Sequence, residues 1–425
     1  MTVEDQQDQV NIPQLRFPEF SGEWEKDSID NIFRFIPTNS FSRKQLNNTR
    51  GNIYNIHYGD IHTKFNVSFD LNTEDVPYIN DNSVVSEITP DTYCREGDVV
   101  ISDASEDYSD VGKAIEIVNV RGARVVAGLH TLLLRQRENY FTRGVLAYLM
   151  QTEIVRKQIM KMANGASVLG ISKSNLQKVN LFFPLSSEQR KIADFLGSVD
   201  EWISSLRKQK EQLETYKHGL MQQIFSQRIC FRDENGQPYP EWEEKKLGDI
   251  FEEVREKAGK EANTYKLLSV TLKDGVINQD ESKKRDISST DKSKYHIVKQ
   301  GDIVYNTMRM WQGAFGLSSF EGIVSPAYTV VRFKEKSDPK FFTYLFKQSR
   351  LIFDFYRYSQ GLTSDTWSLK FRHFSEIMTV VSSSVEEQQK IADFLSAVDE
   401  AIQAKEKHIE DAETWKRGLM QKMFV

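Results

Sequence analysis

Few residues in this 425-residue sequence have the types and spacing that direct catalysis requires. His57 and His62 are five residues apart, which is a poor spacing for two metal ligands on one helix, and no cysteine or carboxylate cluster accompanies them. Glu243-Glu244-Lys245 resembles the E-x-K segment of a nuclease, but no convincing acidic strand precedes it. We interpret the histidines as surface residues and the Glu-Glu-Lys run as the solvated start of a helix.

Motifs for group transfer and nucleotide use are missing from the sequence. It contains no Asn/Asp-Pro-Pro-aromatic segment of an adenine methyltransferase and no GxxxxGK(S/T) phosphate loop. Among its seven histidines we recognise no arrangement of a nucleophile with a base. We therefore expect no catalytic residue, no metal site and no cofactor site in this chain.

Side chains suited to binding occur instead in polar, glycine-punctuated loops that follow strand-like runs, where binding residues concentrate. In the second half of the chain they are Asn306, Arg309, Trp311, Gln312, Tyr328, Gln360, Thr363, Ser364 and Trp367. In the first half they are Asn52, Tyr54, Asn55, His57, Tyr58, Lys64, Arg121, Arg124 and His130. A solvated loop or a packed aromatic explains any single one of them as well as binding does, and core packing is the better explanation for Trp311 and Trp367.

The elements that must position these loops are marked by an internal repeat. Residues 188–225 return without a gap as residues 387–424, at a constant offset of 199 (387 minus 188), and 22 of the 38 aligned positions are identical. The intervening segments match far less well. The chain thus combines one repeated framework with two different inserts.

Each copy of the repeat has the heptad pattern of a long amphipathic helix. With Ile192 at position a, the first copy places apolar residues at a and aromatic residues at d. The seam, which we also take as a surface for docking partners, comprises Ile192, Phe195, Val199, Leu206, Leu213, Tyr216 and Leu220 in the first copy. In the second copy it comprises Ile391, Phe394, Val398, Ile402, Ile409, Trp415 and Leu419.

Chain order indicates how the two helices run. A compact insert returns the chain near the point where it left the first helix, so the second helix is expected to run back along the first. The sequence therefore predicts an antiparallel coiled coil with a pseudo-two-fold relation between the halves and one module at each end. Two independent surface helices are the simpler alternative.

The two modules share landmarks despite their divergence. Pro18-Glu19 with Trp24 corresponds to Pro240-Glu241-Trp242, and a Gly-Asp turn between strand-like runs occurs at residues 97–98 and 301–302. A helix carrying Tyr148 or Tyr344 comes near the end of each module. The sequence thus predicts two mixed α/β domains of about 150 residues, a common domain size, within an α+β fold.

Composition sets the outer bounds. The chain is 39% hydrophobic and 28% charged, which is ordinary for a globular protein, and it has neither a long apolar run nor an apolar N-terminal segment. We expect a cytoplasmic protein without membrane contact. Cys94 and Cys230 lie far apart, which predicts neither a disulfide framework nor a zinc cluster. The net charge of −5 requires any nucleic-acid binding to use local basic faces or a partner.

In combination these features resemble the DNA-specificity subunit of type I restriction-modification systems. The resemblance rests on the order of variable module, EQRKIADFL helix, variable module and EQQKIADFL helix, with the openings FPEFSGEW and CFRDENGQPYPEW, and it covers about residues 15–425. It implies a flexible tail (1–14), target recognition domain 1 (15–185), spacer helix 1 (186–228), target recognition domain 2 (229–384) and spacer helix 2 (385–425).

The resemblance also implies a function. Each recognition domain would read one half of a bipartite DNA target with a fixed, unread gap of a few base pairs, and the halves should differ because the modules differ. The loop residues above become candidates for base contacts, with Lys283, Lys284 and Arg285 as candidates for phosphate contacts. The helices would dock two copies of the methyltransferase subunit. S-adenosylmethionine, ATP and Mg²⁺ would act on the partner subunits, namely the adenine methyltransferase and the ATP-dependent restriction subunits.

A coiled-coil adaptor that bridges two proteins is the alternative, with the modules as protein-binding heads. The acidic net charge favours it slightly, whereas the repeat layout favours a DNA-specificity subunit.

Overall fold

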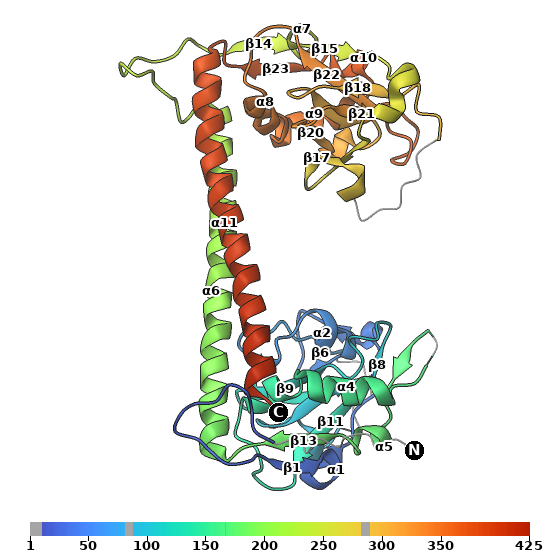
Figure 1. The fold of residues 1–425 in the computed structure, drawn as a ribbon, viewed down its shortest axis with the longest axis vertical. Helices are drawn as coiled ribbons and strands as arrows, with labels where there is room; N and C mark the ends of the chain where they lie inside the picture. The colour runs from blue at the N-terminus through green and yellow to red at the C-terminus, as the bar shows by residue number, and fades with distance from the viewer. Residues whose placement is uncertain (1–10, 81–87, 166, 282–289) are drawn as a thin grey trace, which may run out of the picture. The chain divides into compact units, whose positions relative to one another are not determined.

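The structure is a computed structural model that describes residues 11–80, 88–165, 167–281 and 290–425 (Figure 1). The chain divides into two compact units. Unit 1 consists of Met1–Arg207 and Lys407–Val425, and unit 2 consists of Lys208–Glu406. We call residues up to 185 of unit 1 domain 1, and residues 226–384 of unit 2 domain 2.

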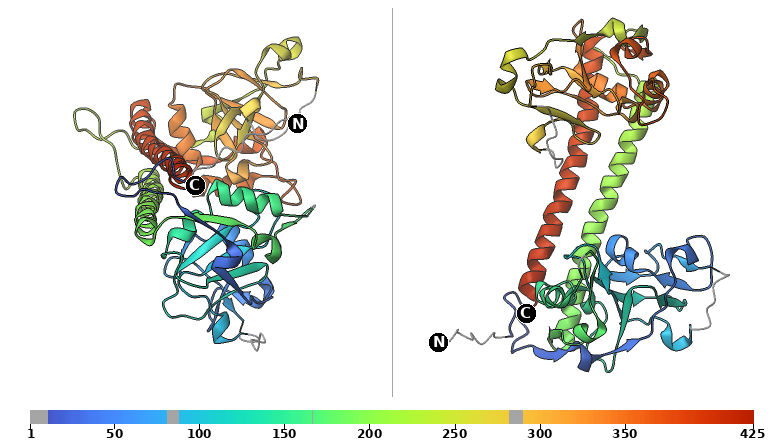
Figure 2. Two further views of the ribbon diagram at one scale, coloured as in Figure 1. Left: turned by 60° about the horizontal axis from the view of Figure 1, so that its bottom comes forward. Right: turned by 90° about the vertical axis from the view of Figure 1, so that its right-hand side faces the viewer.

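Each unit also contains a segment of both long helices. Helix α6 spans Ser186–Phe225 and helix α11 spans Val385–Met423, as the repeat predicts. In unit 1 the buried residues Val199, Ile203 and Leu206 of α6 pack with Ala412 of α11. Farther toward the start of α6, Ile192 and Leu196 share a core with Leu419 and Met423. Rising numbers in α6 therefore meet falling numbers in α11, so the two segments are antiparallel (Figure 2).

The helix segments of unit 2 pack in the same sense. Lys210 pairs with Glu406 at 3.3 Å, and Lys217, one heptad later, pairs with Asp399 at 2.5 Å. Beyond them, Leu220 and Ile224 lie in one core with Leu395 and Ile391. The predicted antiparallel coiled-coil pairing is confirmed in both units.

The predicted heptad frame is only half right. The a positions face the partner, but the second buried row lies four residues after a, at Leu196, Ile203 and Ile224, rather than at d. The aromatic residues predicted at d lie at the edge of the seam, and Trp202, Tyr216, Phe394 and Trp415 are exposed. Apolar side chains occur both three and four residues after a, so the sequence is compatible with either stripe. The position of the partner helix decides between them.

Domain 1 is built on a five-stranded sheet of order β2-β11-β7-β9-β5 (Figure 1). The strands are β2 (Phe33–Ile36), β11 (Thr131–Gln136), β7 (Val99–Ser102), β9 (Ala114–Asn119) and β5 (Ser68–Asp70). All neighbours are antiparallel except β5 and β9. A second sheet joins β10 (Val125–Ala127), β4 (Tyr54–Ile56), β6 (Tyr78–Ile79) and β3 (Leu46–Asn47).

Shorter elements complete domain 1. Two strand pairs are β1 (Glu25–Ser28) with β13 (Asn180–Phe183) and β8 (Ala104–Ser105) with β12 (Leu169–Gly170). The helices are α1 (Ile29–Ile32), α2 (Tyr58–Thr63), α3 (Val145–Leu149), α4 (Glu153–Met162) and α5 (Lys173–Leu176). The core around α3 and β7 is continuous with the first turns of α6 and the last turns of α11.

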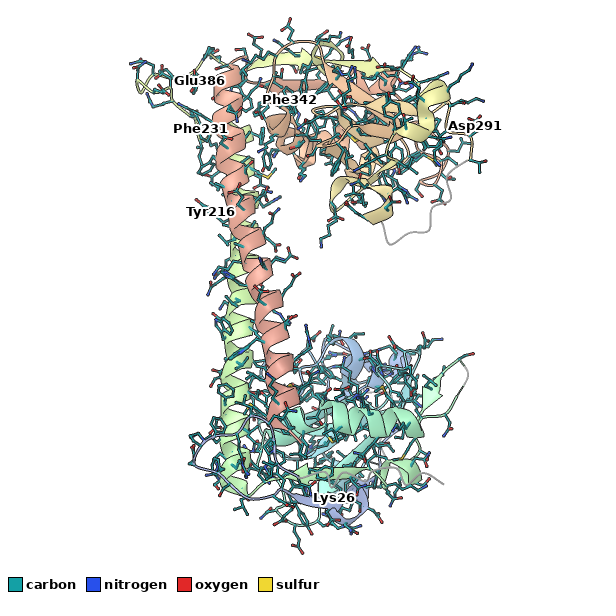
Figure 3. All side chains as sticks on the ribbon, viewed as in Figure 1. Lys26, Tyr216, Phe231, Asp291, Phe342 and Glu386 are labelled. Atoms are coloured by element: carbon teal, nitrogen blue, oxygen red, sulfur yellow. The ribbon has the colours of Figure 1, made fainter. Side chains whose placement is uncertain are left out.

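Domain 2 has a four-stranded antiparallel sheet of order β15-β22-β19-β20. Its strands are β15 (Phe251–Val254), β22 (Tyr328–Phe333), β19 (Ile303–Asn306) and β20 (Phe315–Leu317). Strand pairs are β14 (Glu243–Lys246) with β23 (Met378–Val381), β16 (Leu268–Thr271) with β17 (Gly275–Asn278), and β18 (His296–Val298) with β21 (Gly322–Val324). The helices are α7 (Leu247–Ile250), α8 (Pro339–Phe346), α9 (Ser349–Tyr358) and α10 (Phe371–Phe374). Phe342 of α8 points into this core, whereas Tyr216 of α6 points to solvent (Figure 3).

The Gly-Asp turns predicted from the sequence hold equivalent ion pairs. Gly97 and Gly301 have φ values of +89° and +91°, which favour glycine. The aspartate after each glycine directly precedes the next strand, and it binds an arginine on the neighbouring strand through both of its oxygens. These pairs are Asp98 with Arg135 and Asp302 with Arg332, each with a shortest distance of 2.7 Å. The turn is thus tied to the sheet in the same way in both domains.

The Glu-Gln dipeptide that opens each repeat attaches the helix to its domain. The side-chain oxygen of Gln189 accepts the backbone N–H of Thr142 at 2.8 Å, and that of Gln388 accepts the N–H of Asp338 at 2.9 Å. Each amide group also donates to a backbone carbonyl a few residues earlier in the chain. Both glutamines are buried, so they set the direction in which each helix leaves its domain.

The tryptophans of the Pro-Glu-Trp phrases pack on the end of the helix from the other repeat copy. Trp24 contacts Phe424 with ring centroids 5.9 Å apart in unit 1, and Trp242 contacts Phe225 at 6.0 Å in unit 2. Phe225 and Phe424 are equivalent positions of the repeat, since 424 minus 225 is 199. Each copy therefore supplies the start of a helix to one unit and the end of a helix to the other.

Two sequence interpretations of polar segments are wrong. Residues Glu243–Lys246 form strand β14, which pairs with β23, and not the start of a helix; the turn of α7 begins at Leu247. His57 is buried and not a surface residue, because its Nδ1 accepts the backbone N–H of Gly59 at the start of α2. Strand β14 forms by pairing with β23, which is distant in the sequence, so the residue types of 243–246 alone do not indicate it.

Candidate nucleic-acid interface

In domain 2 the structure brings the two predicted loops together. The loop after β19 and the loop between α9 and α10 are joined by a hydrogen bond from the N–H of Leu369 to the carbonyl of Thr307 at 2.8 Å. The rings of Trp311 and Trp367 meet at 5.1 Å with an interplanar angle of 80°, and Tyr356 of α9 lies 4.9 Å from Trp367. The two tryptophans are half-buried against each other, and their contact joins the two loops.

Polar side chains on these loops remain available to a ligand. Arg309, Gln312, Gln360, Thr363 and Ser364 are exposed. The guanidinium of Arg309 makes no ion pair with any residue that the structure describes. Arginine and glutamine are the residue types that bind guanine and adenine edges. This loop pair is therefore the best-formed candidate surface of domain 2.

Two other candidates in this domain already have polar partners within the protein. The side-chain oxygen of Asn306 accepts the N–H of Met308 at 3.0 Å, which shapes the first loop. The hydroxyl of half-buried Tyr328 lies 3.4 Å from that of Ser269. The phosphate-contact candidates Lys283, Lys284 and Arg285 lie outside the described residues.

The second loop displays a residue that sequence reasoning missed. Leu362 is 100% exposed, and it directly follows Gly361, whose φ is +153°. A Cβ at Gly361 would lie 2.6 Å from the carbonyl oxygen of Thr366, so only glycine fits this close approach. Thr363 closes the turn by accepting the N–H groups of Thr366 and Trp367 at 2.9 and 3.1 Å. The hydrogen bonds within the loop fix its conformation, and its leucine side chain is fully exposed to solvent.

Domain 1 has a corresponding hairpin after α4. Gly165 has a φ of +142°, and the backbone of Asn164 pairs with that of Gly170, as that of Gln360 pairs with that of Ser368. Val168 is exposed on this hairpin. The one sequence signal for both hairpins is a glycine a few residues after an amphipathic helix.

Several predicted ligand-binding residues of domain 1 are structural. Asn55 is fully buried, and its side-chain oxygen accepts the amide of Asn39 at 2.8 Å. The hydroxyl of Tyr54 accepts that of Tyr78 at 2.8 Å. His57 caps α2, and burial lowers its pKa, so it stays neutral at pH 7. All three side chains thus have partners within the domain, and their contact with DNA stays a prediction. The pairing of β4 with β10 and β6 buries Asn55, and the sequence of residues 54–56 does not show that pairing.

Other candidates of domain 1 remain on the surface. Tyr58 and His130 meet with ring centroids 5.3 Å apart, and Nδ1 of His130 lies 3.2 Å from Asp103. Arg121 and Arg124 are exposed on the connection between β9 and β10, and Asn52 is exposed before β4. The ammonium of Lys64 pairs with Asp75 at 2.6 Å. The structure thus separates this set into three groups. They are the Tyr-His pair of Tyr58 and His130, the arginine turn formed by Arg121 and Arg124, and single residues.

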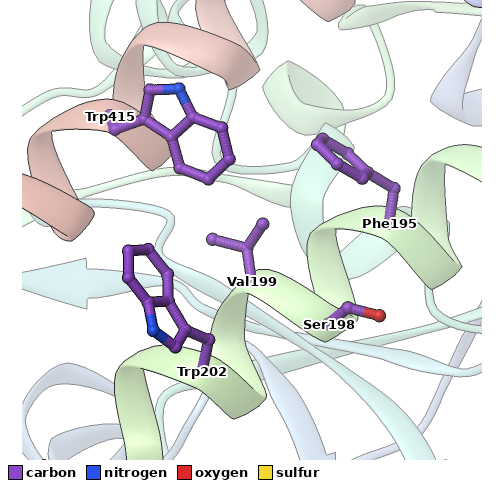
Figure 4. A pocket seen from close by; sticks show the side chains of 5 residues that line it. All are labelled: Phe195, Ser198, Val199, Trp202 and Trp415. Carbon is purple, nitrogen blue, oxygen red and sulfur yellow. The ribbon is translucent and has the colours of Figure 1, made fainter. Parts of the chain in front are cut away.

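The helix segments offer a second kind of surface, which is apolar. In unit 1 an open groove is lined by Phe195, Ser198, Val199, Trp202 and Trp415 (Figure 4). The two tryptophan rings lie 6.3 Å apart. Phe17 extends the groove by an edge-to-face contact with Phe195 at 5.9 Å. Exposed aromatic clusters of this kind are typical of protein interfaces.

Unit 2 has the equivalent surface with different residues. Phe231 contacts Phe394 at 5.8 Å, as Phe17 contacts Phe195. Tyr216 replaces Trp415, and Ala401 replaces Trp202, at the same offset of 199. The residues predicted at d are therefore surface residues of each helix pair and available to a partner.

Two further kinds of site were sought in the described part of the chain. Across residues 11–80, 88–165, 167–281 and 290–425, no three histidine, cysteine, aspartate or glutamate side chains gather in a way that could hold a metal ion. Among the same residues, no helix combines the length and the apolar character needed to cross a bilayer.

Comparisons with known proteins agree on one family. The sequence model described as "Type I restriction modification DNA specificity domain" matches residues 22–215 and again residues 239–414. The chain is 24% identical over 291 residues to the type I restriction enzyme MjaVIII specificity subunit of Methanocaldococcus jannaschii, covering 64% of this chain and 68% of that protein. It is 30% identical over 114 residues to the MjaIX specificity subunit of the same organism, covering 25% of this chain and only 26% of that protein.

Solved structures share the fold over nearly the full length. The type I restriction-modification S subunit from M. genitalium matches with a TM-score of 0.52 and 14% identity, covering 97% of this chain and 99% of that chain. A chain from a structure titled for the complex assembly and conformational transition of the type I R-M system matches with a TM-score of 0.55 and 11% identity, covering 94% and 97%. At these identities the likeness concerns the fold.

Proposed function

Because this chain belongs to the family of type I restriction modification DNA specificity domains, we propose that it is the specificity subunit of a type I restriction-modification complex. Each recognition domain reads one half of a bipartite DNA target, and the bases between the halves are not read. The domains we assign are 15–185 and 229–384, with 186–228 and 385–425 as spacer helices. The observation that carries this proposal is the double match, because each match includes its own polar loops.

Unlike loops support unlike half-sites. Domain 2 offers an arginine and two glutamines around a tryptophan pair, whereas domain 1 offers an arginine turn and a Tyr-His pair. Hydrogen-bond donors and acceptors in a different arrangement select different base edges. The target is therefore asymmetric, and no palindrome is expected.

Partners supply the chemistry. Equivalent aromatic surfaces on the two helix pairs suit two copies of one partner, the methyltransferase subunit. This chain itself is not an enzyme and binds no cofactor. S-adenosylmethionine binds to the methyltransferase subunits, and ATP with Mg²⁺ binds to the restriction subunits, all in the cytoplasm. With a net charge of −5, this chain also depends on its partners for part of the attraction to DNA phosphates.

Exchange of one domain tests the proposal. Residues 15–185 are replaced by the corresponding domain of a related chain, and DNA from cells expressing it with the methyltransferase subunits is sequenced for modified adenine. One half of the methylated motif should change and the other should stay the same. A motif that changes in both halves contradicts one reader per domain. Methylation without any sequence preference instead favours a coiled-coil adaptor.

Paired point variants refine the assignment. Arg309→Ala with Gln312→Ala should weaken discrimination at the second half-site by about tenfold or more, because each good base contact contributes ~1–3 kcal/mol. Arg121→Ala with Arg124→Ala is the matched control in domain 1 and should affect the first half-site alone. Loss of discrimination at both half-sites in either variant would show that these loops do not read bases separately.

A further inference from the structure

One arrangement of three residues occurs in both units. In unit 1 the hydroxyl of Tyr148 on α3 donates to Oδ2 of Asp200 on α6 at 2.9 Å. Nζ of Lys416 on α11 donates to Oδ1 of the same aspartate at 2.5 Å. The lysine ammonium also lies over the tyrosine ring, 5.1 Å from its centroid. These residues are the first triad, and they join the domain to both helices.

The second triad repeats this geometry in unit 2. The hydroxyl of Tyr344 on α8 donates to Oδ2 of Asp399 on α11 at 2.7 Å, and Nζ of Lys217 on α6 donates to Oδ1 at 2.5 Å. Lys217 lies 5.1 Å from the centroid of the Tyr344 ring. The same three residue types therefore connect the same three kinds of element.

The triads are reciprocal between the two copies of the repeat. Asp200 and Asp399 are equivalent positions, as are Lys217 and Lys416, since both pairs differ by 199. Yet Asp200 binds the lysine of the second copy, and Asp399 binds the lysine of the first. Each copy of the repeat gives its aspartate to one triad and its lysine to the other. Both triads therefore require the aspartate and the lysine to be present in both copies.

The triads do something that the surrounding apolar core does not. Burial of Trp24, Leu419 and Phe424 attracts the domain to the helix pair, but hydrophobic contact has no preferred direction and tolerates rotation. Hydrogen bonds and ion pairs are directional. One carboxylate that accepts from a domain tyrosine and a helix lysine fixes the angle between all three elements.

Burial also acts on the two tyrosines of the triads. It raises the pKa of the Tyr148 and Tyr344 hydroxyls well above their ordinary value, and the neighbouring aspartate adds to the rise. Both tyrosines thus remain neutral donors. The lysine side chains are mostly covered, with 18% exposure for Lys416 and 16% for Lys217, so solvent screens these pairs less than ordinary surface pairs.

We propose that the two triads are positioning residues that hold each recognition domain at one orientation on its helix pair, and that the strict gap between the half-sites depends on them. This inference rests on the proposed function. The triads touch no base. Their loss should leave each half-site sequence unchanged while the complex accepts gaps one base pair shorter or longer.

The test uses the complex with its methyltransferase subunits and duplexes that carry both half-sites at the natural gap, one base pair less and one more. Tyr148→Phe removes a single hydroxyl and should fold, and Lys416→Met removes the ammonium but keeps the aliphatic stem. We expect the preference for the natural gap, measured as a ratio of methylation rates, to fall about tenfold because a hydrogen bond to a charged group is lost. Tyr344→Phe and Lys217→Met should act alike.

Lys407→Met and Lys208→Met are the matched controls. These lysines are also identical in the two copies, but both are exposed, and neither forms an ion pair with a described residue. Their substitution should leave the gap preference unchanged. Folded triad variants with an unchanged rate ratio would overturn the inference, as would altered base preference within a half-site at an unchanged gap. If the wild-type complex ignores duplex sequence, the proposed function itself fails.

Discussion

The two recognition domains agree where they meet the helices and differ where they face outward. Tyr148 and Tyr344 make the same contacts, and the Gly-Asp turns hold equivalent arginines. The loops beyond β7 and β19 share little. Residues that contact three elements at once are constrained from several sides, whereas an exposed loop residue is constrained by its ligand alone. The framework is therefore duplicated, and the specificity is free to diverge.

Small differences within the shared framework sharpen this comparison. Arg135 of domain 1 is 7% exposed in its ion pair with Asp98, whereas Arg332 of domain 2 is 31% exposed in its pair with Asp302. A carboxylate supports the N-terminus of the tyrosine-bearing helix in both domains. Glu116 does so from a distant strand in domain 1, and Asp338 does so as the helix cap in domain 2.

The largest effect is expected from breaking the more buried ion pair. Arg135→Met leaves the Asp98 carboxylate buried without its partner, which should cost about 3–5 kcal/mol of the free energy of unfolding. Arg332→Met should cost less, because water can replace a partly exposed guanidinium. Chemical denaturation of the full chain measures both values. Equal losses would show that burial does not distinguish the two domains at this point.

A pH effect of intermediate size should come from Glu116. Burial raises the pKa of its carboxyl to about 7 in the folded chain. The folded state therefore holds a proton that the unfolded state releases near its ordinary pKa, and stability falls as the pH rises from about 4.5 through 7. The loss should approach about 3 kcal/mol. Glu116→Gln should flatten this part of the curve of unfolding free energy against pH.

Asp338→Asn gives the comparison in domain 2. Burial also raises the pKa of Asp338, so its contribution has the same sign. Asp338 is slightly more exposed than Glu116, at 7% against 1%, and we expect a smaller change. A pH slope of opposite sign in either variant would contradict the assignment of burial as the cause.

The smallest effect should be on DNA affinity and not on folding. Leu362→Ala removes the side chain at the tip of the hairpin, and affinity for the cognate duplex should fall about fivefold to tenfold, as for a leucine that is largely buried on binding. Leu272→Ala, an exposed leucine on the β16–β17 turn, is the matched control and should change nothing. Unchanged binding of the Leu362 variant would exclude the hairpin tip from the interface.

Much of the architecture could be predicted because periodic patterns in the amino-acid sequence indicate it. The repeat predicts both long helices, their antiparallel pairing and the two mixed domains. At the start of α11, the side-chain oxygen of Ser384 accepts the backbone N–H of Glu387. Alternation and helical periodicity are local properties. The exposed residues Arg309 and Gln312 follow strand β19, as the sequence pattern indicates, whereas the exposed residue Gln360 follows helix α9.

Other features could not be predicted because they depend on what lies opposite in space. Asn55 and His57 have the types of ligand-binding residues, yet both are buried, with the Asn55 side-chain oxygen bound to Asn39 and Nδ1 of His57 bound to Gly59. Leu362 has the type of a core residue, yet a hairpin closed by Thr363 keeps it in solvent. Residue type alone does not distinguish these environments.

By itself the sequence determined that the protein has two unlike modules on a duplicated framework, because repeats and heptads are visible without coordinates. Only the tertiary structure decided which stripe of each helix faces its partner and which lysine meets which aspartate. The buried stripe and the lysine–aspartate pairing depend on contacts between side chains about 200 residues apart, made by three different elements. A local sequence pattern contains no information about such distant contacts.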